Sequence, residues 1–307
     1  MVCTEALPAP SPLLASFRAD GVVSPLHVLP EEEARALASD CQRLLRNAEA
    51  NGVAGGEQGA ARSANLLAPW LHNLTRDERV LRHVRQIIGD DIFCWQADVM
   101  HKPDGSAHWC SLHQDAFIPG ELRLAPCTYG KDPFEQLVSA WIALTPSTIA
   151  SGAVRVMRGT HRLGLLPHAL TKRPGQANQN DSNMLAAGQT VDDEALVATA
   201  QARGVPLSAD EERVLELKPG ELSLHHAHTL HRSGPNTSPE PRIGIAVRYV
   251  AASLRKYARP GDEDPAVLVS GVDKHHFFRE IHPHGPDAAE LSAEAVALHA
   301  QVRARRG

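Results

Sequence analysis

The sequence lacks any apolar run that approaches the roughly 18 residues that a transmembrane helix needs. It also lacks a basic start followed by an apolar stretch, so we expect no secretory signal. No C-x-x-C pair occurs among its five cysteines, an odd number that favours a reduced, cytoplasmic protein. A basic stripe is missing as well, and the formal charge is −5. We therefore expect neither nucleic acid nor a membrane as a partner.

Apolar material for a core and an excess of histidine are present instead. Apolar residues make up 43% and charged residues 22% of the 307 residues, which is typical of a globular protein and too hydrophobic for a disordered one. The length fits one large domain or two ordinary ones. The 17 histidines direct the search toward metal ligands.

The first ninety residues are predicted to be a loose arm, residues 1–14, followed mainly by helices. Three glutamates and an apolar stripe predict a helix over residues 31–48. Residues 75–78, Thr-Arg-Asp-Glu, are typical of a capping box and predict a second helix that ends at Gly89. We expect this region, residues 1–90, to pack on the rest of the domain.

The middle of the chain, residues 91–275, is predicted to be a β core, so that the whole chain is mainly β with flanking helices. Short β-branched or alternating segments recur there between glycines and prolines, and they favour a sandwich, jelly roll or barrel. The segments are residues 92–100, 136–145, 153–157, 214–217, 221–224 and 243–250.

A polar stretch at residues 163–213 is poor in strand signal and is predicted to be an insertion. Long insertions of this kind are often lids, so we expect one that closes over a substrate, and a surface insertion far from the site is the alternative. The end of the chain, residues 276–307, is predicted to be a helical tail, with its helix over residues 287–305.

His113-Gln114-Asp115 is the sharpest short motif in the chain. Residues i and i+2 of a β-strand point to the same face, so an imidazole and a carboxylate would project together there. With 17 histidines and 36 acidic residues among 307, chance alone gives about two His-x-acid triplets, and the sequence has one. A surface histidine beside an unrelated aspartate explains the triplet alone equally well.

The segment over residues 221–242 adds a second cluster of candidate ligands. It contains four histidines, His225, His226, His228 and His231. One of them would complete two histidines and one carboxylate, the set that leaves open positions on Fe(II) for a co-substrate and dioxygen. Catalytic zinc also uses two histidines and a carboxylate, so the ligand types alone leave both metals open.

Spacing distinguishes among these histidines. Residues 231–236 read H-R-S-G-P-N, and Arg242 follows His231 by eleven residues. With the H-x-D triplet 118 residues earlier, the pattern resembles the phytanoyl-CoA dioxygenase family. The similarity continues through VSAWIAL, SGAVRV and GTHR and covers roughly residues 90–275. Leu112, where the family commonly has an aromatic residue, and Arg158, in place of a frequent proline, depart from the pattern.

The resemblance implies a double-stranded β-helix core, the jelly-roll or cupin-like fold, and an oxygenase that depends on Fe(II) and 2-oxoglutarate. It implies His113, Asp115 and His231 as the iron ligands. The co-substrate contacts that it implies are Arg242, Ser233, Gln114, Lys102 and Trp141. A guanidinium suits the distal carboxylate because it binds a carboxylate through two parallel hydrogen bonds. The alternative for Arg242 is an exposed arginine at a strand end. Ser233 could equally be a turn residue, and Trp141 a core residue. The other histidines of the cluster are expected to be strand residues or donors that orient the ligands.

The implied reaction is hydroxylation of an unactivated C–H bond, with dioxygen as oxidant, release of succinate and CO2, and ascorbate as a supporting reductant. Related halogenases carry a small residue in place of the carboxylate ligand, so Asp115 favours hydroxylation. The overall pattern favours a small polar substrate, an organophosphonate or an amino-acid-like metabolite. A natural-product scaffold is the alternative substrate. A non-catalytic metal-binding β-barrel that serves as a sensor or binding module is the alternative of a different class.

Overall fold

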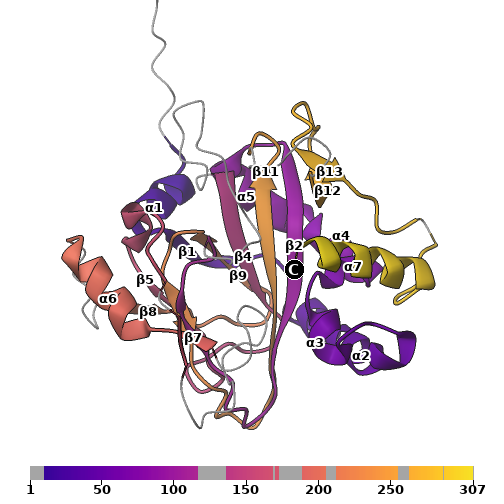
Figure 1. Ribbon diagram of the computed structural model, residues 1–307, viewed down its shortest axis with the longest axis horizontal. Helices are drawn as coiled ribbons and strands as arrows, with labels where there is room; N and C mark the ends of the chain where they lie inside the picture. Colours follow the sequence, from indigo (N-terminus) through magenta and orange to yellow (C-terminus); the bar gives the residue numbers. More distant parts are fainter. Residues whose placement is uncertain are drawn as a thin grey trace, which may run out of the picture.

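Two sheets form the centre of the molecule, with helices on the outside (Figure 1). The computed structural model describes residues 10–116, 136–168, 170–172, 189–204, 212–254, 263–285 and 287–306. The larger sheet has the strand order β1 (Val22–His27), β9 (Glu221–His226), β4 (Leu137–Ala143), β11 (Arg242–Ala251), β2 (Ile92–Lys102), β12 (Asp264–Ser270) and β13 (Phe278–Glu280). The smaller sheet has the order β3 (Cys110–His113), β10 (His231–Ser233), β5 (Val154–Met157) and β8 (Glu212–Val214).

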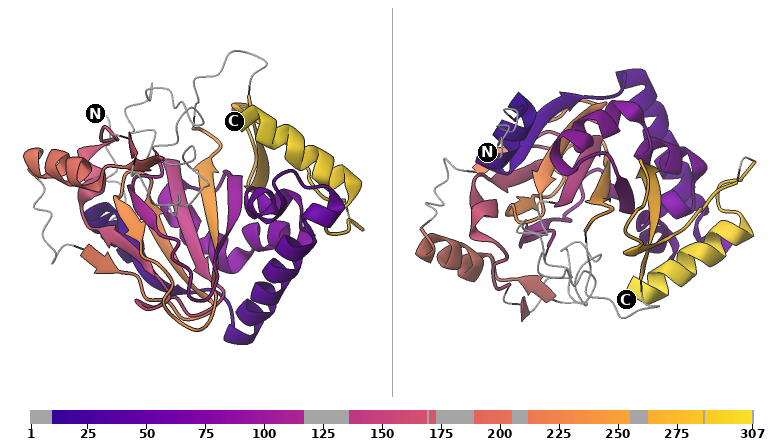
Figure 2. Two further views of the ribbon diagram at one scale, coloured as in Figure 1. Left: turned by 60° about the horizontal axis from the view of Figure 1, so that its bottom comes forward. Right: turned by 90° about the horizontal axis from the view of Figure 1, so that it is seen from above.

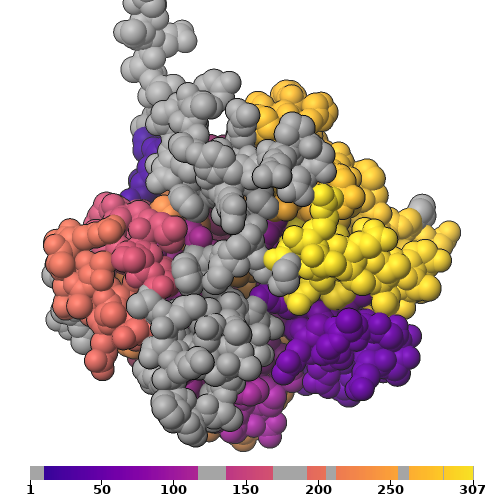
Figure 3. Space-filling model, viewed as in Figure 1, coloured from indigo at the N-terminus to yellow at the C-terminus, as the bar shows by residue number. Residues whose placement is uncertain are grey.

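The helices divide between two sides of the molecule. The helices are α1 (Pro12–Asp20), α2 (Glu31–Asn47), α3 (Gly56–Ala61), α4 (Pro69–Thr75), α5 (Glu78–Ile88), α6 (Asp193–Ala202) and α7 (Ala293–Arg306). Short 3-10 turns are η1 (Glu49–Asn51), η2 (Ala64–Leu66) and η4 (Thr160–Leu163). Both views of Figure 2 place α7 beside α2, α3 and α4, whereas α1 lies on the other side of the molecule. On the face shown in Figure 3, α6 forms one flank, and α7 with α2 and α3 forms the other.

Strand alternation gives the larger sheet two different faces. In β11, Ile243, Ile245 and Val247 join the aliphatic core beneath the helices. Leu44 of α2 and Val84 of α5 pack into the same core. The opposite face of β11 is directed toward the smaller sheet, because successive side chains of a strand point to opposite sides. The space between the two sheets is therefore free for polar side chains.

The first ninety residues contain a strand that the sequence did not predict. β1 pairs antiparallel with β9 at the edge of the larger sheet. Pro25 lies in it, and a proline is tolerated on an edge strand although it weakens the strand signal. The predicted capping box was also wrong: Thr75 ends α4, and Asp77 caps α5 by accepting a hydrogen bond from Arg79 N at 2.8 Å.

Other boundaries differ from the prediction by a few residues. α1 begins at Pro12, inside the expected arm, whose residues 1–9 lie outside the described part. β8 lies two residues earlier than the predicted segment. α7 begins at Ala293 rather than at residue 287. β3, β10, β12 and β13 were not predicted as separate strands, because three of these four strands have only three or four residues.

The predicted insertion contains more regular structure than expected. Within residues 163–213 lie α6 and the paired strands β6 (Leu170–Lys172) and β7 (Gln189–Val191). Leu196 and Ala200 of α6 are buried against Leu112 of β3. Residues 173–188 and 205–211 lie outside the described part, so the lid expected there stays a prediction. Among the described residues, none of the helices has the length and apolar character needed to cross a membrane.

Gly220 provides a stability test of how the N-terminal segment attaches to the larger sheet. Its φ is +87°, and a Cβ there would lie 2.1 Å from the carbonyl oxygen of Leu29. Gly52 has a similar φ of +77°, but a Cβ at that position would meet no atom within 4 Å. We expect Gly52→Ala to cost about 1 kcal/mol for the left-handed backbone. Gly220→Ala should cost about 1–3 kcal/mol more, because the Leu29 backbone must move. Urea unfolding of the two variants measures the difference, and equal costs would contradict this account.

Candidate metal centre

The two candidate histidine ligands lie opposite each other on paired strands. β3 and β10 pair antiparallel with His231 directly across from His113. Asp115 follows the end of β3 in a turn. One ligand atom from each of the three residues lies within 4.8 Å of the other two, and all three residues are buried. The structure thus brings together residues that lie up to 118 positions apart in the sequence.

The hydrogen bonds of the two imidazoles suit a metal ion. Nδ1 of His113 lies 2.8 Å from the carbonyl oxygen of Ser111, and Nδ1 of His231 lies 2.9 Å from that of Thr229. Because a carbonyl only accepts, each Nδ1 carries a hydrogen, and in the neutral ring the lone pair is therefore on Nε2. Two Nε2 lone pairs and one carboxylate are a donor set for a divalent transition metal. The residues present therefore fit a metal ion.

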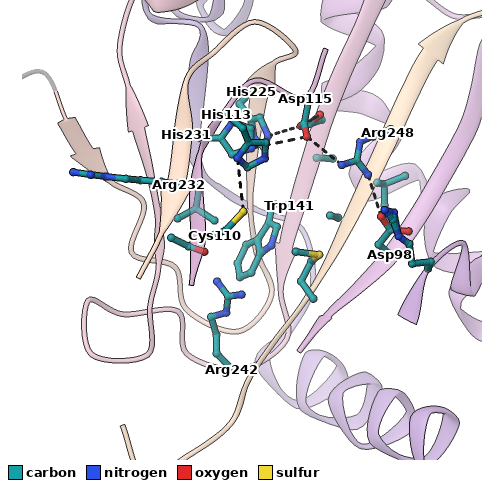
Figure 4. Close-up of a pocket in the computed structure, with 18 residues that line it drawn as sticks. Asp98, Cys110, His113, Asp115, Trp141, His225, His231, Arg232, Arg242 and Arg248 are labelled. Carbon is teal, nitrogen blue, oxygen red and sulfur yellow. Dashed lines mark hydrogen bonds and ion pairs between the residues drawn. The ribbon is translucent and has the colours of Figure 1, made fainter. Parts of the chain in front are cut away.

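Three donors hold the Asp115 carboxylate, and Figure 4 labels two of them, His225 and Arg248. Ser139 Oγ donates to Oδ2, His225 Nε2 lies 3.1 Å from the same oxygen, and Arg248 donates to Oδ1 at 3.1 Å. Burial alone would raise the pKa of Asp115, but Arg248, His225 and His231 hold it well below its ordinary value. Asp115 is therefore an anion. His225, expected to be a strand residue or an orienting donor, occupies the donor role.

Arg248 joins Asp115 to a second buried carboxylate. Its guanidinium lies 3.1 Å from Asp98 as well as from Asp115, and its side chain is only 12% exposed. Asp98 also accepts hydrogen bonds from Gln96 Nε2 at 2.8 Å and from the backbone N–H of Ser63 at 2.9 Å. One guanidinium thus neutralises two carboxylates in part, and it fixes the orientation of the anionic ligand.

The two histidines differ in how readily they take up a proton. Burial and the neighbouring His113 hold the pKa of His231 well below its ordinary value. Burial also lowers the pKa of His113, but Cys110, Asp115 and the Ser111 carbonyl outweigh it and raise the pKa to about 9. Since a metal ligand must be deprotonated, a metal ion would displace this proton, and its affinity should fall at low pH.

The triad opens into a pocket between the two sheets, of about 740 Å³ including space open to solvent. Trp141, Ser233 and Arg242, which the resemblance implies as co-substrate contacts, line this pocket. In Figure 4, Trp141 lies between the histidines and Arg242, whose guanidinium carbon is 5.2 Å from the centroid of the indole ring. Arg242 is 2% exposed and donates to the Gly152 carbonyl at 2.9 Å. It is a buried pocket arginine and not an exposed strand end.

Lys102 lies behind this wall of the pocket. It is buried, and its Nζ donates to Ser233 Oγ at 2.8 Å and to the carbonyl of Gly234. Because the ammonium only donates, Ser233 accepts this bond, and its own hydroxyl hydrogen can be directed elsewhere. Lys102 therefore contacts Ser233, not the pocket.

Gln114 has a different place from the one that the resemblance implied. Its amide donates to the carbonyls of Gly164 at 2.9 Å and His228 at 2.6 Å, and accepts from the N–H of Leu166 at 2.8 Å. It is fully buried and does not line the pocket described above. A side chain occupied by three backbone groups positions the chain between the ligands, so a co-substrate contact does not fit this geometry.

Two further histidines of the cluster lie outside the triad. His226 Nδ1 accepts a hydrogen bond from the His228 N–H at 3.0 Å, and its ring is packed beside Phe17 and His161. Burial lowers the pKa of His226 to about 3. Within the described ranges, His226 and His228 join no group of candidate metal ligands.

Sequence reasoning missed several pocket residues. They are Arg62, Asp98, Met100, Cys110, Ser139 and Arg248. The signal for some of them was strand alternation. Ser139 lies two residues before Trp141 in β4, and Arg248 lies six residues after Arg242 in β11, so both share a face with a residue already assigned to the pocket. Asp98 had the same signal, because it lies four residues before Lys102 in β2, whereas Arg62 had none.

The fold and the triad together define a metal-dependent oxygenase of the jelly-roll class, and comparison with known proteins assigns the family. The phytanoyl-CoA dioxygenase family model matches residues 17–244, so the chain belongs to this family. Membership confirms the double-stranded β-helix fold and the class of enzyme, a 2-oxoglutarate-dependent oxygenase with Fe(II) as its metal.

Two curated relatives and two solved structures illustrate the range of the family. The ectoine dioxygenase of Streptomyces avermitilis is 25% identical over 245 residues, 77% of each chain. The 1-deoxypentalenic acid 11-beta-hydroxylase of Streptomyces arenae is 28% identical over 200 residues, 61% of this chain and 57% of that one. The non-heme monooxygenase ThoJ superposes with a TM-score of 0.74 at 26% identity, covering 96% and 95% of the two chains. CytC3 with Fe(II) and alpha-ketoglutarate shares the fold, with a TM-score of 0.62 at 22% identity over 89% and 93%.

Removing Arg248 should destabilise the protein and should make metal binding more stabilising. Arg248→Met leaves two buried carboxylates without their shared cation, which should cost roughly 3–5 kcal/mol. A divalent metal restores positive charge next to Asp115, so we expect the rise in Tm on metal addition to be larger in the variant than in the wild type. Anaerobic thermal unfolding with and without Fe(II) measures both effects. Arg46→Met, on the exposed face of α2, is the control. An equal rise in Tm would contradict the proposed charge balance.

Proposed function

We propose that His113, Asp115 and His231 bind Fe(II), that Arg242 and Ser233 bind 2-oxoglutarate, and that the enzyme hydroxylates a C–H bond of a small polar metabolite. The observation that carries this proposal is the convergence of two Nε2 atoms and one carboxylate on a pocket that Arg242 also lines. Membership of the family supports the class of reaction, and the geometry supports the assignment of individual residues.

The metal and the co-substrate supply the oxidising power: 2-oxoglutarate and dioxygen become succinate and CO2 while a C–H bond becomes C–OH. The protein binds the co-substrate, orients the substrate C–H bond and excludes water. Arg242 is suited to the distal carboxylate of 2-oxoglutarate, because its buried guanidinium offers several fixed N–H donors. Trp141 packs against the guanidinium and holds it in place.

Ser233 is the second group suited to that carboxylate. Because Lys102 donates to its Oγ, the Ser233 hydroxyl can donate its hydrogen into the pocket. Lys102 then acts through Ser233 as a positioning residue. A neutral hydroxyl and a charged guanidinium would together recognise one carboxylate from two strands, β10 and β11.

The substrate we propose is an organophosphonate or an amino-acid-like metabolite. The pocket combines apolar side chains, such as Met100 and Val154, with several charged groups, as expected for a compact molecule that is polar at one end. One relative is named for ectoine, a compact polar compound, which favours a substrate of this size. Another is named for 1-deoxypentalenic acid, and it keeps a natural-product scaffold as the second candidate.

Succinate formation tests the proposed function. Purified protein with Fe(II), ascorbate and 2-oxoglutarate should release succinate slowly by itself and faster with a metabolite fraction that contains the substrate. A protein that binds Fe(II) and 2-oxoglutarate but forms no succinate with any fraction would instead be a sensor or binding module. The fraction that stimulates release identifies the substrate.

Asp115→Ala should abolish hydroxylation, because it removes the anionic ligand and leaves two neutral imidazoles. We expect Fe(II) binding, measured by metal content after desalting, to fall together with succinate release. Asp104→Ala removes an exposed carboxylate on a turn and should leave both unchanged. Wild-type turnover in Asp115→Ala would show that the ligand assignment is wrong.

Arg242→Ala should raise the apparent KM for 2-oxoglutarate while the fold persists. Losing one partner of a buried charge pair costs roughly 2–5 kcal/mol, so an increase of about 30-fold or more is expected. Initial rates of succinate release against 2-oxoglutarate concentration give the value, and Arg46→Ala is the control. An unchanged KM would place the carboxylate partner elsewhere.

A further inference from the structure

Arg62 is a buried arginine that the co-substrate and the metal do not account for. It lines the pocket, and the residue is only 8% exposed. Its Nε is fully buried with no hydrogen-bond partner. Across the described part of the chain, no ion pair to its guanidinium is seen. A buried guanidinium without an anion is costly, so a residue of this kind is expected to meet its anion in a ligand.

The backbone of Arg62 is held firmly in place. Its carbonyl accepts a hydrogen bond from His299 Nε2 of α7 at 2.8 Å. The N–H of the next residue, Ser63, donates to Asp98 at 2.9 Å, and Asp98 is paired with Arg248. The position where Arg62 enters the pocket is thus fixed by the C-terminal helix on one side and by the buried charge network on the other.

The charges that line the pocket leave one cation over. Arg62, Arg242 and Arg248 face two carboxylates, Asp98 and Asp115, while Arg232 is paired with Glu212 at 2.7 Å. Arg248 bridges both aspartates. The two positive charges of a divalent metal and the two negative charges of 2-oxoglutarate cancel each other. One positive charge therefore remains when both are bound, and Arg62 is the guanidinium to which no partner has been assigned.

We propose that Arg62 binds an anionic group of the substrate, a carboxylate or a phosphonate, and so holds the substrate while its C–H bond faces the metal. This inference rests on the proposed function, whose substrate class it narrows to molecules with an oxyanion. The apolar wall formed by residues such as Met100 and Val154 packs against the uncharged part. Recognition by a guanidinium suits both anions, because it can donate two parallel hydrogen bonds to either.

Matched probes test the site in the absence of turnover. Anaerobic protein with Fe(II) and saturating 2-oxoglutarate is titrated calorimetrically with phenylacetate, with benzylphosphonate and with the uncharged phenylacetamide. We expect at least one anion to bind more tightly than the amide. Arg62→Met should weaken binding of that anion roughly ten- to hundredfold, as for the loss of a hydrogen bond to a charged group. The stronger anion shows whether the site prefers a carboxylate or a phosphonate.

Three controls make the result specific. Arg62→Lys keeps the positive charge and should retain part of the anion affinity, and it serves as the test variant if Arg62→Met does not fold. Arg46→Met should bind the anion as the wild type does. The affinity for 2-oxoglutarate should be unchanged in Arg62→Met, whereas a loss there would assign Arg62 to the co-substrate and overturn the proposal.

The proposed anion site at Arg62 would also be overturned by equal binding of anions and amide to the wild type. An unchanged anion affinity in both Arg62 variants would overturn it as well. Failure of the proposed function is a separate result, because it is read from succinate release by the wild-type protein without any probe. Anion binding that depends on Arg62 in a protein that forms no succinate would contradict the oxygenase assignment and leave the anion site standing.

Discussion

The antiparallel pairing of β3 with β10 places His113 directly across from His231, and the rest of the site is arranged around that register. A shift of either strand by one residue would turn one imidazole to the other face of the sheet. Each ring is oriented by a carbonyl of its own strand or the turn before it, so the pairing sets the distance between the rings and these carbonyls set their directions. Asp115 then needs only the turn after β3 to reach the same point.

The larger sheet supplies the rigid support for the pocket that the short strands β3 and β10 cannot. β11 is ten residues long and lies between β4 and β2, with aliphatic side chains toward the helices and arginines toward the pocket. Buried arginines need a rigid surrounding, because a flexible one would admit water and weaken each ion pair. The helices on the outer face of the sheet therefore support the chemistry on its inner face, and Arg62 at the end of α3 reaches the pocket itself.

How much the sequence could predict depended on whether a residue's neighbours in space were also its neighbours in a motif. The H-x-D triplet and the histidine eleven residues before Arg242 identified the triad and its pocket arginine, because their spacing is a property of the chain. Arg62 comes from a short turn between α3 and η2, and only the packing of that turn on β2 brings it to the pocket. The capping box failed for a similar reason: four suitable residues were present, but Thr75 was already the last residue of α4.

The hydrogen bonds from the two imidazoles to main-chain carbonyls have a consequence for how the protein tolerates sequence change. In both cases the carbonyl belongs to the residue two positions before the histidine, Ser111 or Thr229. Every amino acid carries a backbone carbonyl, so no single substitution at these two positions removes the acceptor. The side chains of Ser111 and Thr229 can therefore vary without loss of the imidazole tautomer, whereas Ser139 and Arg248 hold Asp115 through groups that one substitution deletes. The acceptors that orient the two histidines are thus independent of side-chain identity, whereas these two donors that hold the aspartate are not.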